Sequence, residues 1–218
     1  MAFRKISFVS GEYYHIYNRG NSKQCIFRDK NDYVRFLGLL FACNSSNNFK
    51  IDNLNKKQSL LDSARGDQIV YIGAYCLMPN HFHILLTDTG EGNISKFMQK
   101  VITAYVMYYN KKYQRSGSLF EGKFKAEHAS TDRYLKYLFS YIHLNPVKLI
   151  EPKWREIGIQ NKLKVLKYLE QYQYSSYLDY FGVECQEKVI IDKDHFPDYF
   201  SIRKDFQKEI FEWLNFLR

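Results

Sequence analysis

The chain has 218 residues, 45% of them hydrophobic, and a formal net charge of +9 at neutral pH. This composition is typical of a globular protein that buries a core, built as one domain or as one domain with an appendage. The apolar runs are far shorter than the roughly 20 residues that cross a bilayer, and the start lacks an apolar leader. We therefore expect neither a membrane span nor secretion. The four cysteines are dispersed, which is typical of the cytoplasm, and the positive charge favours nucleic acid or an anionic surface as partner.

In the first half of the chain, apolar residues alternate at strand spacing over residues 12–17 and follow helical spacing over residues 29–41, after Asp29 or Asn31 as cap. Residues 44–67 are polar and indicate a surface insertion with a mobile tip and a short helical piece near 54–63. Two β-rich runs follow, at 68–77 and 81–87, joined by a Met-Pro-Asn connection that suits an antiparallel hairpin.

In the second half, Asn93 is the expected cap of an amphipathic helix that runs to about residue 113. Residues 117–127 are predicted to be extended, as an edge strand. Thr131 or Asp132 caps a further helix, which we expect to end at Pro146 because the residue before a proline avoids the helical region. Helical patterns return in residues 161–169 and 206–217.

The predicted order β, α, β, β, α, β, α matches an α+β protein with a ferredoxin-like split βαβ antiparallel sheet, although order alone leaves other α+β layouts open. We expect helices on one face of this sheet and a helical C-terminal extension. Residues 1–150 would form the main domain, with the polar insertion at about 44–67, and residues 151–218 the extension. The chain lacks the glycine-rich loops that hold nucleotide phosphates, so no nucleotide cofactor is expected.

The first pattern that carries chemistry is His81-Phe82-His83. Side chains at i and i+2 of a strand point to the same face, so the two imidazoles could share one metal ion, while Phe82 and Ile84 face the core. Taken alone, two histidines in a strand are more often surface or hydrogen-bonded residues.

The second pattern is Tyr141 and Asn145 at the end of a predicted helix. Residues at i and i+4 lie on one helix face, so a phenol and a carboxamide would project together. Spacing alone favours an ordinary aromatic core stripe, but Asn145 before Pro146 places a polar acceptor where the helix ends.

Four segments in the same order resemble the REP-associated tyrosine transposases, relatives of the single-tyrosine HUH transposases. The resemblance covers roughly residues 12–182, apart from the polar insertion at 44–67, and the tail beyond about 183 lies outside it. Its motifs are YHIYNRG at 14–20, MPNHFHILL at 78–86, YIHLNPVK at 141–148 and YSSY at 174–177. The resemblance implies a ferredoxin-like catalytic domain that cleaves and rejoins single-stranded DNA at hairpin sequences through a 5′-phosphotyrosine. It assigns Tyr141 as the nucleophile and His81, His83 and Asn145 as metal ligands, although many relatives carry glutamine at the last position. We leave His15 in a packing or surface role, with His128 and His195, and give His143 no role.

Physical chemistry is consistent with these roles. A tyrosine phenol is mostly protonated at neutral pH, so its attack on a phosphodiester needs help, and a divalent metal polarises the phosphate. Two imidazoles and an amide oxygen suit Mg²⁺ or Mn²⁺ in function, although imidazoles would also accept Zn²⁺ or Ni²⁺. We expect basic residues near the motifs to follow the DNA backbone: Arg19, Lys111, Lys112, Arg115, Lys123, Lys125 and Lys148.

Two other functions stay open at this point. One is a nucleic-acid-binding regulator without catalysis, and the other is a metal-dependent nuclease that uses water, with Tyr141 as a structural residue. The sequence does not distinguish a monomer from a homodimer.

Overall fold

The computed structural model describes residues 7–47, 60–63, 65–199 and 203–212. Its sheet has four strands in the order β2-β3-β1-β4, and each neighbouring pair is antiparallel. Helix α1 connects β1 to β2 and helix α2 connects β3 to β4, which confirms the predicted split βαβ arrangement. The elements of this part are β1 (Tyr13–Arg19), α1 (Lys30–Ala42), β2 (Val70–Met78), β3 (His81–Asp88), α2 (Asn93–Lys112) and β4 (Lys125–His128).

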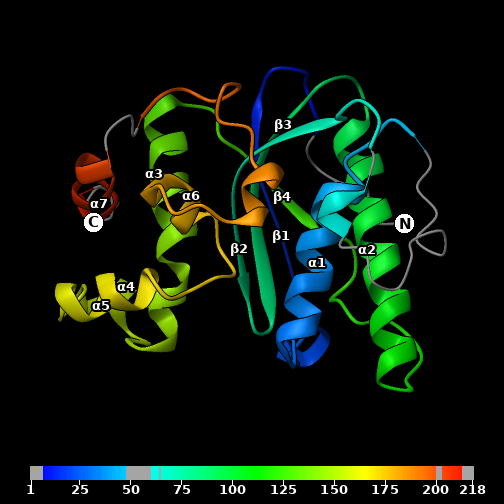
Figure 1. Cartoon of the computed structure of the whole chain (residues 1–218), viewed down its shortest axis with the longest axis horizontal. Coiled ribbons are helices and arrows are strands. Elements are labelled where there is room, and N and C mark those ends of the chain that lie inside the picture. The colour runs from blue at the N-terminus through cyan, green and yellow to red at the C-terminus, as the bar shows by residue number, and fades with distance from the viewer. Residues whose placement is uncertain (1–6, 48–59, 64, 200–202, 213–218) are drawn as a thin grey trace.

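Helices cover both faces of the sheet (Figure 1). Helices α1 and α2 take one face, as expected, and Ile16, Phe82 and Ile84 are fully buried there. The opposite face, which the expected layout left open, is covered by α3 (Asp132–Leu144), whose apolar side packs on Cys76 and Leu85. Alternation along β3 therefore sends the two histidines towards the α3 side of the sheet and Phe82 into the larger core.

The predicted capping residues are confirmed for two helices and wrong for one. Asp29 caps α1 with a reciprocal capping box, and Thr131 caps α3. The prediction that Asn93 caps α2 is wrong, because Gly92 occupies the cap with a left-handed φ of 78°. The side-chain amide of Asn93 donates instead to Thr89 Oγ1, and the Asp88 carboxylate accepts from the backbone N–H of Ile94.

The end of α3 also departs from the prediction. The helix ends at Leu144, but Asn145 keeps helical φ and ψ although it precedes Pro146, and the chain continues into a 3-10 helix, Asn145–Leu149. The Asn145 backbone donates to Ile142 O, and its side-chain Nδ2 donates to Tyr141 O over 2.9 Å. The side chain thus satisfies a helix-end carbonyl, which supports a conformation that proline disfavours in the residue before it.

Most of the chain after residue 150 packs as a further helical layer on the α3 side (Figure 1). The 3-10 helix Gln186–Ile190 is the exception, because it packs against α1 and places Ile190 in the larger core. The cluster of the helical layer includes Leu144 at the end of α3, Trp154 and Phe206. The elements are α4 (Trp154–Ile157), α5 (Lys162–Leu169), α6 (Tyr177–Phe181), a 3-10 helix (Gln186–Ile190) and α7 (Arg203–Glu212). Shorter 3-10 turns lie at Asn21–Lys23 and Leu60–Asp62. The helical piece expected near 54–63 falls mostly outside the described residues, as does the end of the tail expected at 206–217.

The YSSY segment runs along β2 rather than facing solvent. Leu77 N donates to Tyr174 O, Ser176 N donates to Tyr75 O, and Tyr75 N donates to Ser176 Oγ. His143 Nε2 lies 2.8 Å from the same Ser176 hydroxyl, so this histidine is part of the packing between α3 and the segment. The late motif therefore has a structural role in holding the C-terminal part against the sheet.

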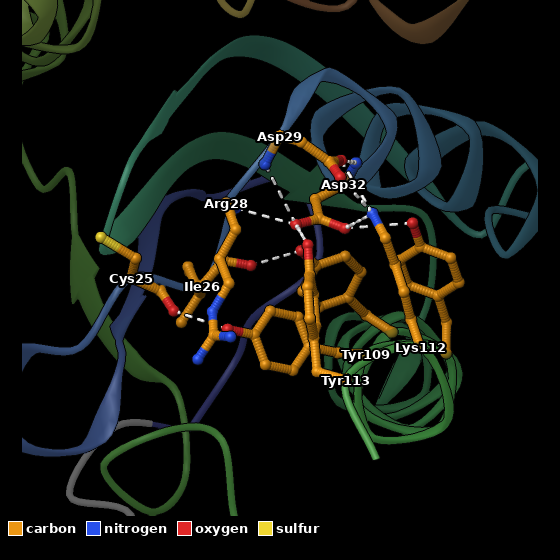
Figure 2. A network of polar contacts seen from close by, with 10 residues as sticks. Cys25, Ile26, Arg28, Asp29, Asp32, Tyr109, Lys112 and Tyr113 are labelled. Carbon is orange, nitrogen blue, oxygen red and sulfur yellow. Dashed lines mark hydrogen bonds and ion pairs between the residues drawn. The ribbon is translucent and has the colours of Figure 1, made fainter. Parts of the chain in front are cut away.

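On the face of the sheet opposite α3 (Figure 1), a buried carboxylate links α1 to α2 (Figure 2). Asp32 is fully buried and accepts hydrogen bonds from Lys112 Nζ, Tyr113 and Tyr108 at 2.7, 2.7 and 3.0 Å. Burial alone would raise the pKa of this carboxyl, but Lys112 and the other donors lower it below the usual value. The network therefore holds α1 and α2 together.

None of the helices in the described residues is long and apolar enough to cross a membrane.

Candidate active site

A pocket of about 660 Å³ opens where β1, β3 and the end of α3 meet. His81, His83, Tyr141 and Asn145 all line it, so one chain brings together the four residues singled out in the sequence. The rings of His81 and His83 lie 5.0 Å apart between centroids, and the ring of Tyr141 lies 5.5 Å from that of His83. The strand alternation and the i, i+4 spacing on α3 therefore converge on one place.

His81 presents one ring nitrogen to the pocket. Its Nδ1 lies 2.6 Å from Asn80 Oδ1, while Asn80 Nδ2 donates to Lys23 O over 3.2 Å. The second bond orients the amide, so Oδ1 is the atom that faces the imidazole and accepts its Nδ1 proton. The Nε2 lone pair of His81 is then available to a ligand.

His83 is only 6% exposed, and its Nδ1 lies 2.8 Å from Nε2 of His15. Its other nitrogen, Nε2, is buried and has no hydrogen-bond partner in the described residues. A buried polar atom without a partner is costly, and such atoms are often completed by an ion, water or substrate. The structure thus leaves a ligating atom of His83 free.

The hydroxyl of Tyr141 receives a hydrogen bond from the Arg155 guanidinium, which also lies 4.4 Å above the tyrosine ring. Arg155 comes from α4, beyond the motifs that the sequence analysis used. Tyr137 also stacks on this ring, with ring centroids 5.7 Å apart. The ring of Tyr141 therefore contacts both a cation and a second ring of its own helix.

Asn145 is 1% exposed, and its Nδ2 is committed to Tyr141 O. The amide oxygen is therefore the atom left for another contact. Together with Nε2 of both histidines, this gives a mixed nitrogen and oxygen set that fits a divalent cation. The described residues contain no group of three or more His, Cys, Asp or Glu that could hold a metal ion, so the set depends on the amide.

The electrostatic surroundings keep the two histidines neutral at neutral pH. Burial, followed by the nearby Lys148, Arg155 and Arg19, lowers the pKa of His81 to about 4. Burial, followed by His15, lowers the pKa of His83 well below its usual value. Because only a neutral imidazole ligates a metal, both rings are in the competent state without a proton to lose.

The predicted DNA-binding residues separate into two groups. Arg19, Lys125 and Lys148 line the pocket, with Arg19 paired to Glu121 at 2.8 Å. The others are not among its lining residues: Lys112 pairs with Asp29 and Asp32, Arg115 bonds Gln24 and Ser118 O, and Lys111 and Lys123 are exposed. Lys112 therefore has structural partners on the α1 side of the molecule.

Sequence reasoning gave no role to Asn80, Lys23 and Arg155, which line the pocket. The packing role expected for His15 agrees with its burial, and its ring lies directly behind His83. Alternation along β1 puts His15 and Tyr17 on the face opposite Ile16, and this signal was available. Arg155 carried no such signal, since only tertiary packing of the C-terminal part brings it to Tyr141.

Two imidazoles, an amide and a phenol in a basic pocket make a site suited to a phosphodiester. Residues 47–145 match the model of the family described as "Transposase IS200 like". The resemblance to transposases is thereby confirmed at the level of the IS200-like family over this segment, which ends at Asn145. A comparison with curated protein sequences gives no significant match.

Solved structures include a similar chain, a REP-associated tyrosine transposase bound to a REP hairpin. The TM-score is 0.49 and the identity is 10%, with 93% of this chain and 98% of that chain covered.

Proposed function

We propose that this protein is a metal-dependent, single-strand DNA transposase that cleaves and rejoins DNA through a 5′-phosphotyrosine at Tyr141. The observation that carries the proposal is the single pocket shared by Tyr141, His81, His83 and Asn145. The family match to IS200-like transposases over residues 47–145 supports the same reaction class. The expected substrate is single-stranded DNA with a hairpin.

In the reaction, the Tyr141 oxygen attacks the phosphorus of the scissile phosphodiester. A bond forms between that oxygen and phosphorus, the bond from phosphorus to the 3′-oxygen breaks, and the phenol proton passes to solvent. The 3′-oxygen leaves as a hydroxyl once it takes up a proton. Because the phosphotyrosine keeps the energy of the phosphodiester, the reverse attack by a 3′-hydroxyl rejoins DNA without a nucleotide cofactor.

Arg155 has two effects on this step. It orients the Tyr141 hydroxyl through a direct hydrogen bond, and it places a positive charge beside the phosphate that the oxygen attacks. Lys148, in the 3-10 helix Asn145–Leu149 that follows α3, lines the same pocket. These charges make the pocket attractive to a phosphate before any chemistry begins.

His81, His83 and Asn145 would hold Mg²⁺ or Mn²⁺ through Nε2 of each imidazole and the amide oxygen. When bound, such an ion polarises the scissile phosphate and stabilises negative charge on the leaving oxygen. The chain supports this by keeping both imidazoles neutral and by engaging the other polar atom of each ligand elsewhere. The three side chains are thereby oriented before an ion arrives.

The direct test is the covalent intermediate. Incubation of the wild-type protein with single-stranded hairpin DNA and Mn²⁺ is expected to give a protein-DNA adduct that survives denaturing electrophoresis. Tyr141→Phe removes the attacking oxygen and is expected to abolish the adduct, while Tyr137→Phe, on the neighbouring stacked ring, leaves it in place. An adduct that persists in Tyr141→Phe would refute the assignment of the nucleophile.

The same experiment separates the other two functions. Cleavage with free 5′-phosphate ends and no adduct would indicate a nuclease that uses water. DNA binding without cleavage, unaffected by His81→Ala or by a chelator, would indicate a non-catalytic regulator.

Salt dependence tests which basic residues contact the DNA backbone. Each phosphate contact on a single strand adds about −0.7 to the slope of log affinity against log salt. We expect Lys148→Ala to reduce this slope by about 0.7 in a fluorescence anisotropy titration, because Lys148 lines the pocket. Lys188→Ala serves as the matched control, because Lys188 is exposed, pairs with Glu184 and is not among the residues that line the pocket, and it is expected to leave the slope unchanged. Equal slopes for all three proteins would remove Lys148 from the DNA path.

A further inference from the structure

His15 connects a metal-ligand candidate to a carboxylate. The residue lies on β1 opposite Glu127 on β4, and it is 3% exposed. Its Nε2 lies 2.8 Å from Nδ1 of His83, and its Nδ1 lies 3.8 Å from Oε2 of Glu127. Three side chains from three adjacent strands therefore form one row that ends at the pocket.

The 2.8 Å contact between His15 Nε2 and His83 Nδ1 requires a proton on one of these two nitrogens, and either ring could carry that proton. If His15 donates, a neutral His83 carries its proton on Nε2, which is buried and has no acceptor in the described residues. In that arrangement the bare Nδ1 of His15 also faces the carboxylate of Glu127, and the two lone pairs repel each other. If His83 donates, His15 carries its own proton on Nδ1, 3.8 Å from the Glu127 carboxylate, so attraction between the N–H and the carboxylate replaces the repulsion. His83 Nε2 then keeps a lone pair rather than a buried N–H without an acceptor, and that lone pair can accept a ligand from the pocket.

We propose that His15 and Glu127 are positioning residues, which hold His83 as the tautomer protonated on Nδ1 and so keep its Nε2 lone pair directed into the pocket. The inference deepens the proposed function and rests on it, because the ligand of that lone pair is the divalent cation of the transposase reaction. Neutral histidine in water prefers the other tautomer, with its proton on Nε2. The row therefore reverses the intrinsic preference of the ring.

The carboxylate end of the row is itself held in place. Glu127 accepts hydrogen bonds from Tyr17 at 2.7 Å and from Tyr134 at 3.0 Å. The nearby His15 and these two hydroxyls lower the pKa of the Glu127 carboxyl to about 2. The Glu127 carboxyl is therefore ionised at neutral pH, and its negative charge attracts the Nδ1 proton of His15.

The two histidines of the pocket are thus supported differently. His81 donates to a neutral amide that is fixed by a backbone carbonyl, whereas His83 donates to an imidazole backed by a charge. A carboxylate behind a ligating histidine raises the electron density on the coordinating nitrogen. We therefore assign His83 as the stronger donor of the pair.

The first measurement needs no substitution. Long-range proton-nitrogen correlation spectra of the metal-free, ¹⁵N-labelled wild-type protein report which ring nitrogen of each histidine carries the proton. The expected result is a proton on Nδ1 and none on Nε2 of His83. A proton on Nε2 of His83 in the wild-type protein would overturn the proposal.

Variants then test the source of this tautomer. His15→Phe keeps a ring of similar size but removes the acceptor, and we expect His83 to change to the tautomer protonated on Nε2 and the affinity for Mn²⁺ to fall by about 10-fold to 100-fold. His15→Gln places an amide oxygen near the position of the lost nitrogen, and both properties are expected to return towards wild type. Calorimetric titration with Mn²⁺ gives the affinities. An unchanged tautomer and affinity in a folded His15→Phe protein would overturn the role of His15.

The two levels of inference fail separately. A wild-type protein that does not bind Mn²⁺ but shows His83 protonated on Nδ1 contradicts the proposed function and leaves the histidine row intact. A wild-type protein that binds Mn²⁺ and forms the DNA adduct, with His83 protonated on Nε2, contradicts the row alone. If His15→Phe does not fold, the wild-type spectrum still decides.

Discussion

His81→Ala is expected to lower the affinity for Mn²⁺ by at least about 100-fold and to reduce formation of the covalent DNA adduct to background. Loss of an orienting group behind a metal ligand already costs about 10-fold to 100-fold in affinity, and removal of the ligand itself costs more. The remaining His83 and Asn145 offer one nitrogen and one oxygen, which is too few to hold Mn²⁺ against water. Calorimetric titration with Mn²⁺ and denaturing electrophoresis of the DNA reaction measure the two effects.

The control for this variant is His128→Ala. His128 lies on β4, is partly exposed and pairs with Glu12 at 2.7 Å, and it is not among the residues that line the pocket. We expect wild-type metal affinity and adduct yield from it. If His81→Ala also kept both, the cation site would have to lie elsewhere and the chemistry proposed for the pocket would be wrong.

Asp32→Ala is expected to lower the free energy of unfolding by about 3 kcal/mol, the largest effect on stability that we predict. Removal of one partner of a buried ion pair leaves the other without its counter-charge, and here it also leaves two tyrosine hydroxyls without an acceptor. The estimate lies at the lower end of the range because Lys112 is partly exposed and regains water. Urea denaturation followed by circular dichroism measures the change.

Acidity provides a second readout of the same carboxylate. The pKa of Asp32 is lowered in the folded protein, so its contribution is fully present above the unfolded value of about 4 and is lost as the pH falls through the folded value. We expect the wild-type protein to lose more stability than Asp32→Ala between about pH 5 and pH 2. Lys111→Ala, adjacent to Lys112 but exposed, should behave as wild type. Parallel acid unfolding curves for all three proteins would show that ionisation of Asp32, the carboxylate of the network in Figure 2, adds no stability.

The strands and helices could be predicted because their signals are local. Alternation in residues 81–84 placed Phe82 in the core and the histidines on the other face, and the i, i+4 spacing placed Asn145 beside Tyr141. The predicted roles of individual side chains were wrong or incomplete where a side chain bonds a residue that local patterns do not indicate. The Asn93 side-chain amide bonds Thr89 instead of capping a helix. Lys112, which was expected to contact DNA, pairs with Asp32 on a helix some 80 residues earlier.

In the candidate site, too, some residues could be predicted from local patterns and others depend on tertiary packing. Its residues from strands and from α3 follow from motif spacing, whereas Arg155 reaches Tyr141 only because α4 packs on the end of α3. Neither hydrophobic periodicity nor charge marks that contact, since it depends on how a separate helical layer docks. Electrostatic support of this kind becomes visible only when the tertiary structure is known.

The docking of the YSSY segment on β2 has a consequence for how copies of this protein can associate. An open strand edge is a template for hydrogen bonding to another chain, and at this border of the sheet the backbone groups of Tyr75 and Leu77 are already occupied by residues of the same molecule. At the opposite border, β4 spans only Lys125–His128, which offers little length for such pairing. Continuous sheets across two molecules are therefore disfavoured, and any dimer would have to join through helices or loops.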